Sequence, residues 1–155
     1  MLHQAYLPIV GSGNNSAILH YIANDQLMKP GQLVLVDAGA EFRGYASDIT
    51  RTFPVDGCFS AVQKEIYEMV LRIQVQLISL AKPGYSFASL FTTAAAGVCS
   101  EMIGAGYILG TQEQCVSKRV YSLFLPHGVS HYLVRCVALP LRCRFDKRHD
   151  RVRAH

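Results

Sequence analysis

The chain has 155 residues, and the half of them that are apolar suit one domain, or a piece of one, with enough apolar surface to bury a core. The net charge of +4 comes from one end: residues 1–133 carry eight Lys/Arg and nine Asp/Glu, a balance of −1, and residues 134–155 carry seven Lys/Arg and two Asp, a balance of +5. Five cysteines without paired spacing indicate reduced thiols and argue against a disulfide framework. We find no signal peptide and no apolar run long enough to span a bilayer, so we expect a cytoplasmic protein that does not contact membranes.

Two aspartates stand out in the first part of the chain. Residues 33–40 and 45–55 have the apolar, β-branched composition and alternation of strands. If Phe42 and Arg43 form the tip of a hairpin, Asp37 and Asp48 are cross-strand partners on one face, with Cβ atoms ~5 Å apart. Like charges that close require one carboxylate to take up a proton or both to share a divalent cation. Two solvated aspartates near a hairpin end are the alternative on spacing alone.

Two helices are predicted in the middle of the chain. Ser60 and Gln63 have the form of a capping box, and apolar residues recur at helical spacing from there to Leu80. A second helix begins near Ser86 and carries apolar residues to Gly104. We expect both apolar stripes to pack against the sheet, and we expect residues 107–122 to form a loop.

Histidines mark the next informative segment, residues 123–133. His127 and His131 are four positions apart, which places them on one face of either a helix or a strand, although Pro126 and Gly128 disfavour a regular helix. Neutral imidazole is a common ligand of divalent metals. Two histidines at a junction between a loop and a strand are the simpler alternative on this spacing alone. The segment lacks the carboxylate of the His-Glu-x-x-His zinc motif.

Three stretches of the chain together resemble the pita-bread metallopeptidases, and most closely their proline-directed branch, prolidase and Xaa-Pro aminopeptidase P. The stretches are residues 8–21 (PIVGSGNNSAILHY), 36–54 (VDAGAEFRGYASDITRTFP) and 125–133 (LPHGVSHYL), in the order of the family. The resemblance covers roughly residues 5–133. It implies an α+β protein with a partial pita-bread fold, in which a curved antiparallel sheet has helices packed on one face.

The resemblance also implies a role for each residue of the site. It assigns Asp37, Asp48 and His131 as metal ligands, with Asp37 bridging two ions. It assigns His127 and His20 as active-site histidines on the substrate side, near the scissile bond. From the residues alone, His20 would be interpreted as a half-buried histidine in a strand.

The reaction implied is hydrolysis of the bond between an N-terminal residue and a following proline. Two divalent ions would activate a shared water. Manganese is the first expectation, with zinc, cobalt or magnesium as alternatives. The implied partner is a peptide with proline in second position, and a homodimer and a mitochondrial location are left open for the full-length protein.

Residues 134–155 depart from the family pattern. The family's two glutamate ligands should follow the histidine ligand, yet the last glutamate is Glu113. We therefore expect residues 1–133 to be a partial catalytic domain truncated at both ends, and residues 134–155 to be a disordered basic tail. The tail lacks an aromatic or Gly-rich pattern for nucleic-acid binding, so no nucleic-acid partner is expected. The sequence predicts an exopeptidase fragment that is inactive by itself; the alternative is a non-catalytic pita-bread module that binds a peptide or protein.

Overall fold

A computed structural model of the chain describes residues 3–133. The expectation of a disordered tail over residues 134–155 lies outside the described residues. The described part divides into two compact units, one formed by residues 3–63 with 132–133 and the other by residues 64–131. Each unit is described by itself.

Antiparallel strands dominate the first unit, and helices dominate the second. The strands are β1 (His3–Gln4), β2 (Ile9–Ser12), β3 (Leu33–Ala38), β4 (Ala40–Phe42), β5 (Tyr45–Ala46) and β6 (Ile49–Pro54). The helices are the 3-10 helix η1 (Gly13–Ala17), α1 (Ala61–Leu80), α2 (Phe87–Gly104), α3 (Gln112–Ser117) and the 3-10 helix η2 (Val120–Leu123). The expected mixture of antiparallel strands and helices is therefore present.

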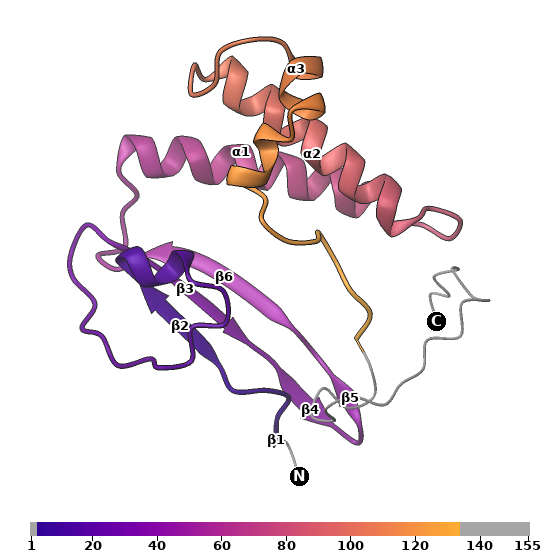
Figure 1. Cartoon of the computed structure of the whole chain (residues 1–155). Coiled ribbons are helices and arrows are strands. Elements are labelled where there is room, and N and C mark those ends of the chain that lie inside the picture. Colours follow the sequence, from indigo (N-terminus) through magenta and orange to yellow (C-terminus); the bar gives the residue numbers. More distant parts are fainter. Residues whose placement is uncertain (1–2, 134–155) are drawn as a thin grey trace. The chain divides into compact units, whose positions relative to one another are not determined.

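The first unit contains two three-stranded antiparallel sheets. One has the order β2-β3-β6 and the other has the order β1-β4-β5 (Figure 1). Val34 on the central strand β3 is almost fully buried, at 2% exposure. A β-branched residue suits that position because it packs well on a pleated surface. Because β3 is paired on both sides, by β2 and by β6, the position of its last residues, including Asp37, is fixed.

The hairpin between β4 and β5 turns at Arg43 and Gly44, so the prediction of a tip at Phe42 and Arg43 is wrong. Phe42 pairs with Tyr45, and both residues between them have positive φ angles, 52° and 83°. Two-residue hairpins favour this turn because its twist matches that of the strands, and glycine tolerates positive φ without a steric penalty. The partner of Asp37 is consequently Thr50 and not Asp48. The register differs by two residues, and an even shift leaves Asp37 and Asp48 on the same face.

The segment between β1 and β2, residues 5–8, bulges where it lies opposite the end of β3. Ala5 donates its backbone N–H to Gly39 O at 2.9 Å, and Ile9 pairs with Asp37. Three residues, 6–8, thus lie opposite Ala38 alone. Extra residues on one strand of an antiparallel pair bend the backbone and change where a side chain points. Tyr6 lies in this bulge.

The side-chain amide of Asn24 fastens a long loop over residues 18–32 to the edge of β2 that does not pair with β3. Asn24 Oδ1 accepts the backbone N–H of Val10 at 2.7 Å, and Asn24 Nδ2 donates to Pro8 O at 2.8 Å. Asn24 itself has a φ of 51°, a conformation that asparagine tolerates better than most residues. The loop therefore satisfies one backbone donor of β2 and the carbonyl group of Pro8, just before the strand.

Both long helices begin where the sequence predicts. Ser60 Oγ accepts the N–H of Gln63 at 3.3 Å while Gln63 Oε1 accepts the N–H of Ser60 at 2.9 Å, the reciprocal pair of a capping box ahead of α1. Ser86 caps α2 by accepting the N–H of Ser89 at 3.0 Å. Both caps satisfy backbone donors that have no partner inside a helix.

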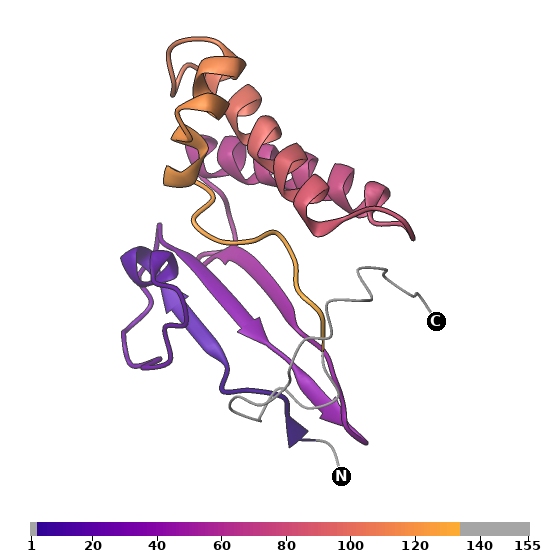
Figure 2. The same ribbon diagram turned by 45° about the vertical axis from the view of Figure 1, so that its right-hand side comes forward.

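The core of the second unit lies between α2, α3 and η2, which contact one another in the turned view of Figure 2. Its buried residues are Ala95, Cys99, Cys115 and Tyr121. The predicted loop over residues 107–122 is therefore wrong, because most of it is helical. A capping box formed by Thr111 and Gln114 starts α3.

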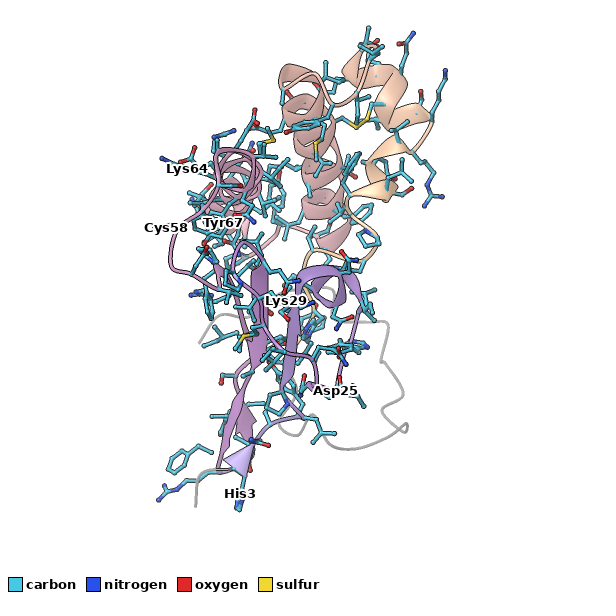
Figure 3. All side chains as sticks on the ribbon, turned by 90° about the vertical axis from the view of Figure 1, so that its left-hand side faces the viewer. His3, Asp25, Lys29, Cys58, Lys64 and Tyr67 are labelled. Carbon is cyan, nitrogen blue, oxygen red and sulfur yellow. A yellow bond between two sulfur atoms is a disulfide. The ribbon has the colours of Figure 1, made fainter. Side chains whose placement is uncertain are left out.

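Cys99 of α2 and Cys115 of α3 form a disulfide, visible as a yellow bond in Figure 3. The expectation that the cysteines are reduced thiols is wrong for this pair. The pairing was not readable from the spacing because α3 was not predicted. Cys58, labelled in Figure 3, is a free and exposed thiol. The expected cytoplasmic location was based on reduced cysteines, and Cys99 and Cys115 do not meet that condition.

Among residues 3–133, α2 alone is long and apolar enough to cross a bilayer by length and composition. By length and composition, α2 therefore contradicts the expectation that the chain has no apolar run long enough to span a bilayer. Helices in the cores of soluble proteins meet the same criterion, and α2 buries Leu90, Ala94, Ala95 and Cys99 within the fold. The finding is weak evidence for a membrane segment.

Candidate metal centre

The two predicted metal ligands come from different strands of the first unit. Asp37 is half-buried on the central strand β3, with Ile9 and Thr50 as its neighbours on either side. Asp48 is exposed and lies just before β6, where the strand pairing is interrupted. The hydrogen bond from Ser47 N to Ala40 O at 2.9 Å continues the hairpin register to that point. Asp48 is therefore held near Gly39, at the end of β3.

Both carboxylates meet at the hydroxyl group of Tyr6. The phenol forms a short hydrogen bond with Asp37 Oδ1, and its oxygen lies 3.0 Å from Asp48 Oδ1. Two aspartates that are 11 positions apart thus converge on one atom. The prediction that Asp37 and Asp48 are direct cross-strand partners is wrong, but the convergence that it was meant to explain is present.

Glycine at position 39 is what allows the phenol to lie there. A Cβ atom on Gly39 would lie 1.9 Å from Ser47 O and 2.7 Å from Cε1 of Tyr6. Real Cβ atoms do not approach other atoms that closely, so a larger residue would displace the backbone or the ring. The ring of Tyr6 therefore packs directly on the backbone between β3 and β4.

The donors present fit a divalent cation. A phenol has one hydrogen to donate, whereas two carboxylates offer several acceptor sites. Tyr6 engages one oxygen of each aspartate, which leaves more acceptor oxygens than the phenol can serve. A cation shared by the pair would offset this concentration of negative charge, and carboxylate oxygens suit Mn, Mg and Zn.

The two aspartates change the pKa of the Tyr6 phenol. Burial, together with the hydrogen bonds to Asp37 and Asp48 and their charge, raises the pKa of Tyr6 above its ordinary value. Burial disfavours the phenolate, and neighbouring negative charge disfavours it further. Tyr6 therefore remains a protonated hydrogen-bond donor throughout the neutral range.

His20 lies in the same unit but in a different setting from the one expected from the residues alone. It is exposed, it follows η1 in a turn, and its φ is 55°. Histidine is one of the residues enriched at positive φ outside glycine. The interpretation of a half-buried histidine in a strand is wrong, and its assigned role at the substrate side stays a prediction.

His127 and His131 lie in irregular backbone after η2, so the alternatives of a shared helix or strand face are both wrong. Both histidines are exposed, and His127 Nδ1 lies 2.8 Å from Gly128 O. They belong to the second unit, whereas the aspartates belong to the first. Within residues 3–133, no group of three or more His, Cys, Asp or Glu side chains is arranged to hold a metal. The assignment of His131 as the third ligand stays a prediction.

Tyr6 was missed by the sequence reasoning. It lies at the start of the resembling region, and the pairing of β2 with β3, together with the bond from Ala5 to Gly39 O, brings it to Asp37. Strand β2 is four residues long and contains a glycine, so its pattern is weak. A prediction of β2 opposite β3 would have indicated that Tyr6, shortly before β2, lies near Asp37.

Known proteins match this chain in sequence and in fold over most of its length. Residues 1–143 match the metallopeptidase family M24. The Xaa-Pro aminopeptidase of Escherichia coli (strain K12) is 40% identical over 131 residues, which cover 84% of this chain and 30% of that protein. The structure of Zn-substituted E. coli aminopeptidase P in complex with product matches with a TM-score of 0.84 and 40% identity, over 87% of this chain and 31% of that one. The structure of aminopeptidase P from E. coli with the inhibitor Pro-Leu matches with the same TM-score, identity and coverage.

The chain belongs to metallopeptidase family M24. The resemblance to the proline-directed pita-bread metallopeptidases is confirmed, and so is the α+β, partial pita-bread fold. The chain spans about 30% of the length of the curated relative that it matches.

Proposed function

We propose that this chain contributes the two aspartate ligands of a dinuclear metal centre in an exopeptidase. The exopeptidase would hydrolyse the bond between an N-terminal residue and a following proline. The observation that carries the proposal is the convergence of Asp37 and Asp48 on the hydroxyl of Tyr6. Similarity to Xaa-Pro aminopeptidases supports the reaction and the substrate class. A product complex and a Pro-Leu complex of aminopeptidase P support the binding of a peptide.

Each residue of the site has a proposed task. Asp37 and Asp48 would hold the ions, with His131 as the single histidine ligand. Two divalent ions, when bound, supply an activated water and polarise the scissile carbonyl group. His127 and His20 would lie on the substrate side, where an imidazole can donate a hydrogen bond to the developing oxyanion or a proton to the departing nitrogen.

The identity of the metal is part of the proposal. Carboxylate oxygens with one imidazole suit several divalent ions, and we propose manganese first. Zinc is the alternative with support, because a Zn-substituted form of E. coli aminopeptidase P is among the matching structures. Cobalt and magnesium remain the further alternatives.

The 155-residue chain should be a poor enzyme by itself. The family pattern places two glutamate ligands after the histidine ligand, whereas the 155-residue chain has no glutamate after Glu113. A centre with three of its five ligands binds metal more weakly, and the usual proton acceptor beside the water is absent. We therefore propose weak metal binding and little or no peptidase activity for this chain.

Calorimetric titration of the 155-residue chain with MnCl2, and hydrolysis assays on Xaa-Pro dipeptides and tripeptides, test this proposal. We expect measurable Mn binding that is strongly reduced by either Asp37→Asn or Asp48→Asn, and no robust turnover. Asp25→Asn is the matched control, because Asp25 also accepts a tyrosine hydrogen bond but lies outside the pair.

Two results would overturn parts of the proposal. Mn binding that is unchanged in Asp37→Asn would refute the metal centre. Robust Xaa-Pro hydrolysis by the 155-residue chain would refute the need for the two further glutamates. Saturable peptide binding without metal dependence or hydrolysis would instead favour the non-catalytic binding module.

A further inference from the structure

We propose that Tyr6 is a positioning residue of the metal centre: its hydroxyl group holds the carboxylates of Asp37 and Asp48 in the arrangement that binds a divalent ion. This inference rests on the proposed function of the aspartate pair. It assigns to the segment between β1 and β2 a direct contribution to metal affinity.

The first argument is the geometry of the contact. Tyr6 Oη contacts Oδ1 of both aspartates and so bridges β3 and the segment before β6. The phenol contacts one oxygen of each carboxylate, Oδ1 in both residues. A hydrogen bond to one oxygen fixes the rotation of a carboxylate and thereby aims the other oxygen.

The second argument is that the scaffold holds the phenol and not only the aspartates. The ring packs against Gly39, where a Cβ would come within 2.7 Å of Tyr6 Cε1. Residues 6–8 bulge opposite Ala38, which turns Tyr6 over the sheet, and Ala5 is anchored to Gly39 O at 2.9 Å. A side chain locked in this way keeps its hydroxyl in place before any ion binds, so the aspartates need less reorganisation on binding.

The third argument is the comparison with a second tyrosine in the same unit. Tyr21 donates a hydrogen bond to Asp25 Oδ1 at 2.7 Å, but Asp25 is fully exposed and is not paired with another aspartate there. The two phenols therefore make similar bonds with different consequences. Removal of the Tyr21 hydroxyl should not affect metal binding, whereas removal of the Tyr6 hydroxyl should.

Calorimetric titration of the 155-residue chain with ZnCl2 tests the inference in the wild type, Tyr6→Phe, Tyr21→Phe and Asp37→Asn. Loss of an outer hydrogen-bond partner typically weakens metal binding 10–100-fold, so we expect the dissociation constant of Tyr6→Phe to rise by roughly 10-fold or more. Tyr21→Phe should keep the wild-type value, and Asp37→Asn should lose the site. Phenylalanine keeps the ring that packs on Gly39, and a thermal unfolding curve checks that Tyr6→Phe is folded.

A measurement on the wild type removes the dependence on a folded variant. In the chain with ¹³C-labelled tyrosine rings, the NMR signal of Tyr6 should shift on addition of Zn²⁺ with the dissociation constant found by calorimetry, while that of Tyr21 stays in place. Wild-type affinity in folded Tyr6→Phe, or a Tyr6 signal that ignores a metal bound through Asp37, would overturn the inference alone. Zinc binding that is equal in the wild type and Asp37→Asn would overturn both the inference and the proposed function.

Discussion

Gly39 occupies the most crowded position in the candidate metal centre. The atoms next to it belong to the backbone of Ser47 and to the ring of Tyr6, and neither can move without disturbing the approach to Asp48. Its backbone is not in the left-handed region, so the requirement for glycine is one of space and not of φ. The residue links the stability of the sheet to the geometry of the site.

Gly39→Ala should destabilise the fold and weaken metal binding together. The added methyl group would lie 1.9 Å from Ser47 O, and overpacking of this kind typically costs about 1–3 kcal/mol. Urea denaturation followed by circular dichroism measures the loss. Gly104→Ala is the control, because no atom lies within 4 Å of its Cβ position, and alanine in a helix stabilises by up to ~1 kcal/mol. Equal stability of the Gly39→Ala variant and the wild type would contradict the crowding described here.

Single residues also show the limit of prediction from sequence. Asp37 and Asp48 were identifiable because charged residues next to apolar strands are unusual. Tyr6 was not, because its part depends on pairing between β2 and β3, which are separated by the long loop over residues 18–32. Residues that join a site only through such distant pairing leave no local pattern.

The elements that were predicted correctly are those with local signals at their ends. Helices α1 and α2 have serine caps and long apolar repeats, and both begin and end close to the predicted positions. Helix α3 has only six residues, so its apolar repeat is too short to read, although Thr111 and Gln114 have the spacing of a capping box. The hairpin register was misplaced because the choice between adjacent turns depends on which residues accept positive φ.

Helices α1 and α2 are joined by an ion pair that should make stability depend on pH. Arg72 Nε and Nη2 donate to the two carboxylate oxygens of Glu101 at 2.9 and 2.7 Å. This bidentate contact lowers the pKa of Glu101 and raises that of Arg72. Both side chains keep some exposure to water, so the effect should be modest.

Glu101→Gln should lower the melting temperature at pH 7 and have little effect at pH 3. A glutamate with a lowered pKa in the folded state stabilises the protein above its unfolded pKa of about 4.3, and this contribution is lost as the pH falls through the folded value. Differential scanning calorimetry of both proteins at the two pH values measures the gap. Glu68→Gln is the control, since its pair with Lys64 is longer, 3.8 Å, and exposed. A gap that is the same at both pH values would show that the ion pair is not responsible.

At the scale of the whole molecule, the described chain combines two units with different sources of stability. The first depends on strand pairing around β3, where long-range hydrogen bonds hold segments that are far apart in sequence. The second depends on a compact helical core closed by a disulfide between Cys99 and Cys115. The family resemblance predicted the first well because two of its three matching stretches, residues 8–21 and 36–54, lie there, whereas the helices that form the core of the second carry no family motif.

Reduction of the disulfide should destabilise the protein. Cross-links that close loops of about 15 residues contribute roughly 3 kcal/mol, and Cys99 and Cys115 are 16 positions apart. Urea denaturation with and without dithiothreitol measures the difference in the free energy of unfolding. The Cys99→Ser/Cys115→Ser double variant should not respond to the reductant, whereas Cys58→Ser should respond as the wild type does. A wild-type protein that is indifferent to dithiothreitol would refute the stabilising role of the disulfide.

The attachment of Asn24 to β2 has a consequence for how this part of the molecule opens. The N–H of Val10 is hydrogen-bonded to an amide side chain and not to a neighbouring strand. We expect that proton to exchange with deuterium when the loop that carries His20 lifts away from the sheet edge. The exchange rate of one backbone amide thus reports how often the loop over residues 18–32 detaches from β2.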